Sequence, residues 1–371
     1  MTNQNLNNSK RIFILGAGSS ISHDDSFPSI NVFFSKAKEL GIDVKKEHPE
    51  LHKYILKNFG IDTNSAKDKI NIEIVFTSLE IDIERTQEAS LQTIRLQILK
   101  LIQSVLIKLI EKIRDKESDL SQFAKRLDPK DTVITFNWDV LLDNILSREK
   151  FLRWAYNYKD EDISKDIPNI YHTFIARLSG FGRGLISEIA LKPPYTAWDN
   201  KNGYFLKLHG SIDWVFCNND LCRAFGEGLP VKEIGDEYYC ASCHEMMHPL
   251  LIPPVLNKQY RKYHLIRRIW NTAFKEVETA NEIIIWGYSL PETDFYSAWL
   301  LRNARQSIER LTLINPSVIK GEKEKKINKA FVNHFTNIFK GKLKKDSIIL
   351  YENFKDYPGN LNAYEKYGIK F

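Results

Sequence analysis

The sequence predicts an α/β fold built on a doubly wound parallel sheet, and two observations support this. The first is a series of short apolar runs of strand length, at 11–15, 131–136, 204–209, 282–286, 311–314 and 347–351. The second is the helical character of the segments between these runs. Continuous apolar strands that alternate with helices are typical of a parallel sheet covered on both faces.

Composition limits the class of protein. The 371-residue chain is 43% hydrophobic and 27% charged, which is ordinary for a folded globular protein. Its net charge of +6 permits contact with nucleic acid but does not indicate it. No apolar stretch approaches the roughly 18 residues of a membrane span, and the polar N-terminus does not look like a secretory signal. We therefore expect a cytoplasmic protein without a membrane segment.

Two regions interrupt the strand pattern. We expect a helical insertion at 29–130, in which the segment 92–114 places apolar residues close to a 3.6-residue period. Its apolar surface is wider than one stripe, so it is either a core helix packed on several sides or part of a subunit interface. Residues 147–203 are expected to form a second insertion of helices and loops. We treat residues 1–371 as one domain carrying these insertions.

A Lys-rich stretch begins at Lys320, with the sequence KGEKEKKINK. The first interpretation is a solvated helix face, and the alternative is a patch that contacts nucleic acid.

A glycine turn follows the first predicted strand, in the sequence RIFILGAGSSIS. Gly16 and Gly18 would let the backbone turn sharply and approach a phosphate. The full dinucleotide fingerprint has a third glycine where this chain has Ile21, and an acidic residue at the end of a second strand. Glu39 and Asp43 have about the right spacing, but their surroundings predict helix and turn. The turn alone therefore leaves nucleotide binding and a plain tight turn both open.

All four cysteines of the chain form two close pairs within 27 residues. The pairs are Cys217 with Cys222, and Cys240 with Cys243. Two close cysteine pairs separated by a loop match a four-cysteine zinc ribbon, which we place at 215–250. His244 and His248 lie near enough to replace a cysteine as ligands. A zinc ion held by four thiolates has no open position, so it would stabilise structure rather than catalyse.

His209 ends an apolar run and precedes a glycine, in FLKLHGSIDWVFC. Taken alone, it is either a buried core histidine at a strand end or a residue placed for chemistry.

Several short motifs occur in one order along the chain. They are GAG at 16–18, TFNWD at 135–139, HGS at 209–211, the cysteine pairs, GYSL at 287–290, and Asn315. This order resembles the sirtuin family of NAD-consuming proteins, over about residues 11–316. The resemblance implies a Rossmann-like domain with a small zinc module.

The resemblance also implies roles for individual residues. The positions that match NAD-contacting residues of the family are Gly16, Ala17, Gly18, Ser19, Thr135, Gly287, Ser289 and Asn315. The positions that match its catalytic centre are Asn137, Asp139 and His209. Cleavage of the nicotinamide–ribose bond builds positive charge on the sugar and needs a group that accepts a proton, which suits a histidine.

Simpler roles for two of these residues stay open. Asn137 could cap the helix that we expect to begin near Trp138. Asp139 could favour the first turn of that helix through the helix dipole.

Two departures from the family bear on activity. The Ile-Pro-Asp-Phe-Arg stretch of the deacylases is replaced by DSFPSINVFF, so Phe27 or Phe33 would have to supply the missing aromatic. After GYSL, the sequence PETDFYSAWLL predicts a helix instead of an extended segment that pairs with a substrate peptide. Water could then attack in place of an acetyl oxygen.

The GYSLPETD form at 287–294 and the long helical insertion resemble the sirtuin-like effector domains of bacterial antiviral defence. The resemblance implies an NAD glycohydrolase that releases nicotinamide and ADP-ribose, acts as a homo-oligomer and responds to self-assembly or a partner such as a HerA-type ATPase. A protein deacylase or ADP-ribosyltransferase, and a non-enzymatic NAD or ADP-ribose sensor, are the alternatives.

Overall fold

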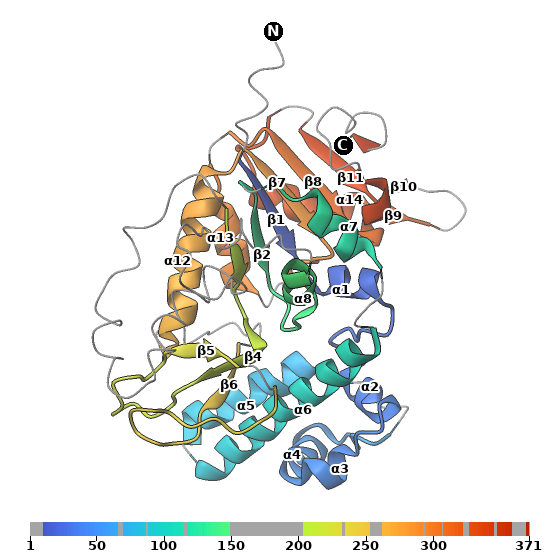
Figure 1. Ribbon diagram of the computed structural model, residues 1–371. Coiled ribbons are helices and arrows are strands. Elements are labelled where there is room, and N and C mark those ends of the chain that lie inside the picture. The colour runs from blue at the N-terminus through green and yellow to red at the C-terminus, as the bar shows by residue number, and fades with distance from the viewer. Residues whose placement is uncertain are drawn as a thin grey trace.

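A computed structural model gives the fold of this chain (Figure 1). It describes residues 10–148, 203–357 and 369–370, apart from gaps at 66–69, 87, 114–116, 129, 232–233, 253–261, 292–293, 306, 322–325 and 345–346. The insertion expected at 147–203 lies almost wholly outside the described residues.

A seven-stranded sheet forms the centre of the described structure. In spatial order its strands are β12 (Ile369–Lys370), β11 (Ile348–Tyr351), β8 (Arg310–Ile314), β7 (Glu282–Trp286), β1 (Arg11–Leu15), β2 (Thr132–Thr135) and β3 (Phe205–Lys207). Every neighbouring pair is parallel except β11 with β12. The chain builds outward from β1 through β2 to β3, and then continues from β7 on the other side of β1. The predicted doubly wound α/β fold is therefore confirmed.

Side chains alternate between two cores on the two faces of the sheet. On β1, Phe13 and Leu15 belong to one core, and Ile12 and Ile14 to the other. This is the two-residue period of a strand buried on both sides. Helices α7 (Asp119–Arg126) and α8 (Leu141–Arg148) cover the first face. Helices α12 (His264–Thr279), α13 (Phe295–Arg302) and α14 (Lys329–Ile338) cover the second.

The remaining described helices precede α7, and most lie in the lower part of Figure 1. They are α1 (Ala17–His23), α2 (Phe33–Glu39), α3 (Val44–Glu47), α4 (Pro49–Phe59), α5 (Ile72–Thr86) and α6 (Ala89–Ile113). Helix α6 has 25 residues, of which 13 are buried, and it packs against α2, α4, α5 and a second sheet. The prediction of a core helix packed on several sides is thus confirmed for this segment.

The second sheet is small and antiparallel. It contains β5 (Gly228–Pro230), β4 (Gly210–Phe216) and β6 (His248–Leu251), in that order. Because β4 begins three residues after β3 ends, the segment between them joins the two sheets. None of the described helices is both long and apolar enough to cross a membrane.

The Lys-rich stretch differs from its predicted structure. Its described residues form a two-stranded antiparallel pair, β9 (Ile319–Lys320) with β10 (Lys326–Ile327), and the helix α14 begins only at Lys329. Two short 3₁₀ turns, Pro316–Val318 and Phe354–Asp356, complete the described elements. The lysines at 320 and 326 are exposed, so the charge run predicted solvation correctly but helix wrongly, because charge reports exposure and not backbone conformation.

Candidate active site

A cavity of about 290 Å³ opens at the carboxyl ends of β1, β2 and β7, where the strand order reverses. Ligands of doubly wound sheets bind at this place because the loops after the strands diverge there. Predicted site residues that line the cavity are Gly16, Ala17, Gly18, Asn137, Asp139, His209, Gly287 and Ser289. The motifs that are far apart in sequence are therefore brought together.

Three predicted site residues do not line this cavity. Ser19 and Thr135 border a smaller cavity of about 10 Å³ beside it. Asn315 follows β8, and its side-chain oxygen accepts a hydrogen bond from the Ser317 backbone N–H at 2.9 Å. In this structure Asn315 thus caps the 3₁₀ turn at Pro316–Val318, and its contact with a ligand stays a prediction.

The two glycine loops pack directly against each other. Gly16 N–H donates to the Trp286 carbonyl at 3.0 Å, and Gly18 N–H donates to the Gly287 carbonyl at 2.8 Å. A Cβ on Gly18 would lie 2.7 Å from the Gly287 Cα, and one on Gly287 would lie 2.3 Å from the Ser19 nitrogen. Gly287 also has a φ of +63°, which favours glycine. Glycine is therefore required here for contact between the loops, whether or not a phosphate binds.

The glycine turn already uses most of its backbone donors. Besides the Gly16 and Gly18 bonds, Ser19 N–H donates to the Gly16 carbonyl at 2.9 Å, and Ser19 Oγ donates to the same oxygen at 2.8 Å. Within the predicted set 16–19, the Ala17 N–H is the backbone donor outside these bonds. A diphosphate held here would depend on this donor and on hydroxyl groups. The turn therefore offers fewer backbone N–H donors to a phosphate than its glycine sequence indicated.

The Asn137 side chain fastens the β2 loop to the glycine turn. Its Nδ2 lies within hydrogen-bond distance of the Gly16 carbonyl at 3.1 Å, Ser19 Oγ at 3.2 Å and Ser20 Oγ at 3.0 Å. It does not cap the following helix, since α8 begins at Leu141. With the amide nitrogen engaged in this way, the carbonyl Oδ1 is the atom of Asn137 suited to a ligand or a water.

Asp139 supports this arrangement from behind. Its carboxylate accepts hydrogen bonds from Ser20 Oγ at 2.7 Å and from the Leu141 backbone N–H at 3.1 Å. The second bond caps the start of α8. Burial raises the pKa of Asp139, although the nearby Lys207 charge opposes this shift. Its carboxylate thus positions Ser20 and, through Ser20, Asn137.

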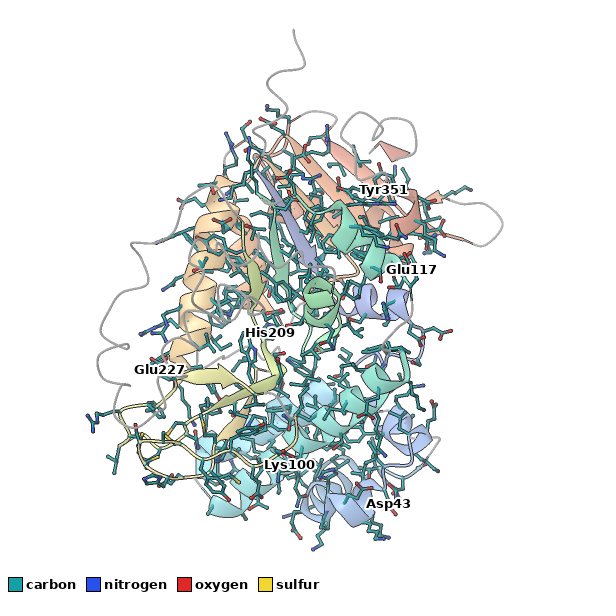
Figure 2. The ribbon with its side chains drawn as sticks, in the orientation of Figure 1. Asp43, Lys100, Glu117, His209, Glu227 and Tyr351 are labelled. Atoms are coloured by element: carbon teal, nitrogen blue, oxygen red, sulfur yellow. The ribbon has the colours of Figure 1, made fainter. Side chains whose placement is uncertain are left out.

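His209 lies between β3 and β4, where the two sheets meet (Figure 2). It is buried, and its Nε2 lies 3.7 Å from Oδ2 of Asp294. This separation is longer than a hydrogen bond but short enough for strong electrostatic interaction in a buried site. Catalytic contacts of this kind often tighten only when substrate is bound. A histidine beside a carboxylate in a cavity can accept a proton and be stabilised as the cation.

Asp294 has a different role from the one its position in the sequence indicated. An aspartate directly before a helix commonly caps its first turn, but the Asp294 side chain makes no capping bond with α13. Its Oδ2 instead accepts hydrogen bonds from Tyr288 Oη at 2.7 Å and Ser297 Oγ at 2.6 Å. Burial, followed by the Asp294 charge, raises the pKa of Tyr288 well above its usual range, so Tyr288 stays a neutral donor.

Aromatic rings surround the imidazole. The Phe136 ring stacks on Tyr288 at 4.4 Å between centroids and lies 5.1 Å from the His209 ring. The Trp270 ring lies 6.5 Å from the His209 ring, between centroids. These rings shield the histidine from bulk solvent and lower the local dielectric, which strengthens its interaction with Asp294.

Sequence reasoning missed Asp294 and Tyr288 as site residues. Their signal was present, because both lie within seven residues of Gly287 and contact the histidine side of the site. It missed Glu73 as well, which reaches the cavity from α5. Phe27 and Phe33, the two candidates for the missing aromatic, both line the cavity and are both buried, so either one fits that role.

The four cysteines also converge, away from this cavity. Their sulfur atoms lie within 4.8 Å of one another, and the Cys217–Cys243 and Cys222–Cys240 sulfurs are each 3.7 Å apart. Four thiolates about 2.3 Å from a tetrahedral zinc would be separated by roughly 3.8 Å, so the donor set fits this ion. Among the described residues, neither His244 nor His248 belongs to the cluster.

By its fold and its site, the chain is a doubly wound α/β protein with a ligand cavity at the switch point of its sheet and a separate four-cysteine cluster. No protein-family model matches the chain, and no curated protein matches it.

Several solved structures are similar to it. One is the ADP-ribose complex of a Sir2 homologue mutant, at 14% identity and a TM-score of 0.37, covering 85% of each chain. Another is the NAD complex of a Sir2 homologue, at 14% identity and a TM-score of 0.34, covering 83% of this chain and 78% of that one. Because the identities and TM-scores are low, the chemistry of the site is inferred from this chain's own residues.

Proposed function

We propose that this chain is an NAD glycohydrolase, which cleaves the nicotinamide–ribose bond of NAD with water. The ordered sequence motifs suggest the ligand. The observation that carries the reaction is the meeting of His209, Asp294 and Asn137 at one cavity at the switch point of the sheet.

The proposed step balances as follows. The bond between the nicotinamide nitrogen and the anomeric carbon breaks, and its electron pair leaves with nicotinamide, which becomes neutral. A water oxygen bonds to the anomeric carbon and transfers its proton to His209. Asn137 Oδ1 accepts the other proton of this water in a hydrogen bond and so orients it. Asp294 stabilises the imidazolium that forms.

Water is favoured as the acceptor by the segment after Gly287. The described residues between Gly287 and the start of α13 at Phe295 contain no strand. Leu290 has a φ of +52°, and its carbonyl lies 2.9 Å from Nε2 of His334. Since an acyl-lysine peptide would need an extended edge to pair with, this segment supports hydrolysis over deacylation.

The test is turnover of NAD by the purified full-length chain, with products identified by mass spectrometry. We expect nicotinamide and ADP-ribose without any peptide. His209→Ala and Asn137→Ala should abolish both products while each variant still unfolds in a cooperative thermal transition. The matched controls are His264→Ala and Asn333→Ala, which replace the same residue types outside the cavity lining. Equal turnover in His209→Ala and wild type would refute the assignment.

The same experiment separates the alternative functions. A deacylase or ADP-ribosyltransferase would release nicotinamide only when an acceptor peptide is added. A sensor would bind NAD in calorimetry and form no product over hours, with or without a partner. We propose further that the enzyme acts in antiviral defence and is activated by self-assembly or by a partner such as a HerA-type ATPase, so turnover should be compared across chain concentrations and with that partner.

The four cysteines are proposed to hold a structural zinc ion, with Cys217, Cys222, Cys240 and Cys243 as ligands. Such an ion would stabilise the loops after β4 and before β6. It takes no part in the proposed reaction, because none of these cysteines lines the cavity.

A further inference from the structure

One wall of the cavity comes from the insertion, and it carries a single charged side chain. The loops after the strands form the opposite wall, with His209 and Asn137. The wall that carries the charge is formed by the insertion together with the two residues before it, Phe27 and Pro28. Its apolar side chains include Phe33, Ile72 and Leu106, and its charged side chain is Glu73. Among the described lining residues there is no Lys or Arg, so acidic groups determine the charge of the cavity.

The backbone at Glu73 is fixed by its neighbours. Asn71 Oδ1 accepts a hydrogen bond from the Glu73 N–H at 2.8 Å, at the start of α5. The Ile72 N–H donates to the Ile30 carbonyl at 3.1 Å, which ties this turn to another part of the same wall. Glu73 is half-buried, and Ile72 beside it is fully covered. The acidic residue is thus held in place at the cavity by the packing of the insertion.

Glu73 lines the same cavity as Tyr288, Asp294 and His209. Its charge contributes to raising the pKa of Tyr288, after the larger effects of burial and Asp294. Tyr288 Oη donates to Asp294, which lies beside His209. Because Glu73 lines this shared cavity, its charge acts on a ligand held there beside His209 and Asp294.

A carboxylate on the wall of a mostly apolar cavity interacts more strongly with ligand charge than one in open solvent, because a bound ligand displaces the screening water between them. It would repel the diphosphate of a dinucleotide and attract the positively charged nicotinamide ring. We propose that Glu73 is the anionic contact that selects and orients the cationic nicotinamide half of the dinucleotide. This inference rests on the proposed function and adds to it a residue supplied by the insertion.

The test compares two dinucleotides that differ in the charge of this ring. NAD⁺ carries a cationic ring, whereas the ring of NADH is neutral. Calorimetry in the His209→Ala background, where turnover is absent, should show that Glu73→Gln weakens NAD⁺ binding by about tenfold, while NADH binding changes by less than about twofold. Glu73→Asp keeps the charge and should recover most of the NAD⁺ affinity. Glu84→Gln is the matched control, since Glu84 is exposed on the same helix and lies outside the cavity lining.

The outcomes are distinct. Equal losses for NAD⁺ and NADH in Glu73→Gln, or no loss for either, would overturn the role of Glu73 even if wild type hydrolyses NAD. Charge-selective binding without any NAD turnover by wild type would keep the role of Glu73 and reject the hydrolase. Absence of binding of both dinucleotides to wild type would overturn both.

Discussion

Nε2 of His209 lies 3.7 Å from Oδ2 of Asp294, although 85 positions of sequence separate the two residues. His209 comes from the junction of β3 and β4, and Asp294 precedes α13, so the fold alone creates this pair. The same carboxylate oxygen accepts hydrogen bonds from two hydroxyl groups, those of Tyr288 and Ser297. A buried imidazole next to a fixed carboxylate is prepared to accept a proton.

Asp294→Asn should therefore reduce NAD turnover by roughly 10²- to 10⁴-fold, the range that positioned proton transfer contributes. The neutral amide can still accept a hydrogen bond, but it cannot stabilise an imidazolium. The measurement is kcat for NAD over a range of pH, with thermal melting to confirm folding.

Tyr288→Phe serves as the milder comparison for that variant. It removes one hydrogen bond to Asp294 and retains the ring that stacks on Phe136 at 4.4 Å. We expect turnover to fall by less than about tenfold, in line with the loss of one hydrogen bond. Unchanged kcat in Asp294→Asn would remove Asp294 from the mechanism.

The contact between the glycine loops predicts a large effect of a single methyl group. Gly287→Ala would place a Cβ 2.3 Å from the Ser19 nitrogen, and the backbone φ of +63° adds strain. We expect a loss of about 2–4 kcal/mol in the free energy of unfolding, measured by urea denaturation.

Gly41→Ala isolates the steric part of this effect. Gly41 has a similar φ of +74°, but a Cβ there would meet no atom within 4 Å. Its substitution should cost only the conformational strain, about 1–2 kcal/mol. If both variants lost the same stability, the close packing of the loops would not constrain residue 287.

The fold was largely predictable from the sequence because strands buried on both faces leave a simple pattern. All six predicted apolar runs are parallel strands in the structure. The order of the motifs identified Gly16, Asn137 and His209 as site residues. They meet in the fold because each follows a strand and the carboxyl ends of parallel strands lie at one edge.

Other parts of the site could not be predicted in the same way. The approach of Asp294 to His209 depends on where α13 begins and how Leu290 turns, which a local pattern does not determine. Glu73 reaches the cavity through the packing of helices in the insertion, and nothing in its own surroundings distinguishes it from other helix glutamates. For Asn315 the prediction was a ligand contact, whereas in the structure its side chain caps a local turn.

The cysteine cluster predicts a metal-dependent module. The purified chain should contain about one zinc per molecule by elemental analysis, and Cys240→Ser should lose it. Hydrogen exchange should then increase in residues 217–247, while the parallel sheet stays protected. All four cysteines belong to the cluster, so a chelator applied to wild type is the comparison for this variant. Absence of zinc together with unchanged exchange after chelation would contradict a structural metal site.

The raised pKa of Asp213, on β4, should make the free energy of unfolding depend on pH. Burial raises its pKa to about 6, with the neighbouring Asp143 charge adding to this effect and Lys207 opposing it. The unfolded chain loses the same proton near pH 4. Between about pH 4 and pH 6 the folded state therefore binds more protons than the unfolded state, and the free energy of unfolding falls as pH rises.

Asp213→Asn cannot titrate, so its urea midpoint should fall less than that of wild type between pH 4 and pH 6. The expected difference between the two profiles is about 1–2 kcal/mol, after allowance for the partial exposure of the residue. Asp356→Asn is the control, since Asp356 is an exposed aspartate of the 3₁₀ turn at Phe354–Asp356. Its profile should follow that of wild type, and a parallel profile for Asp213→Asn as well would show that Asp213 ionises without effect on folding.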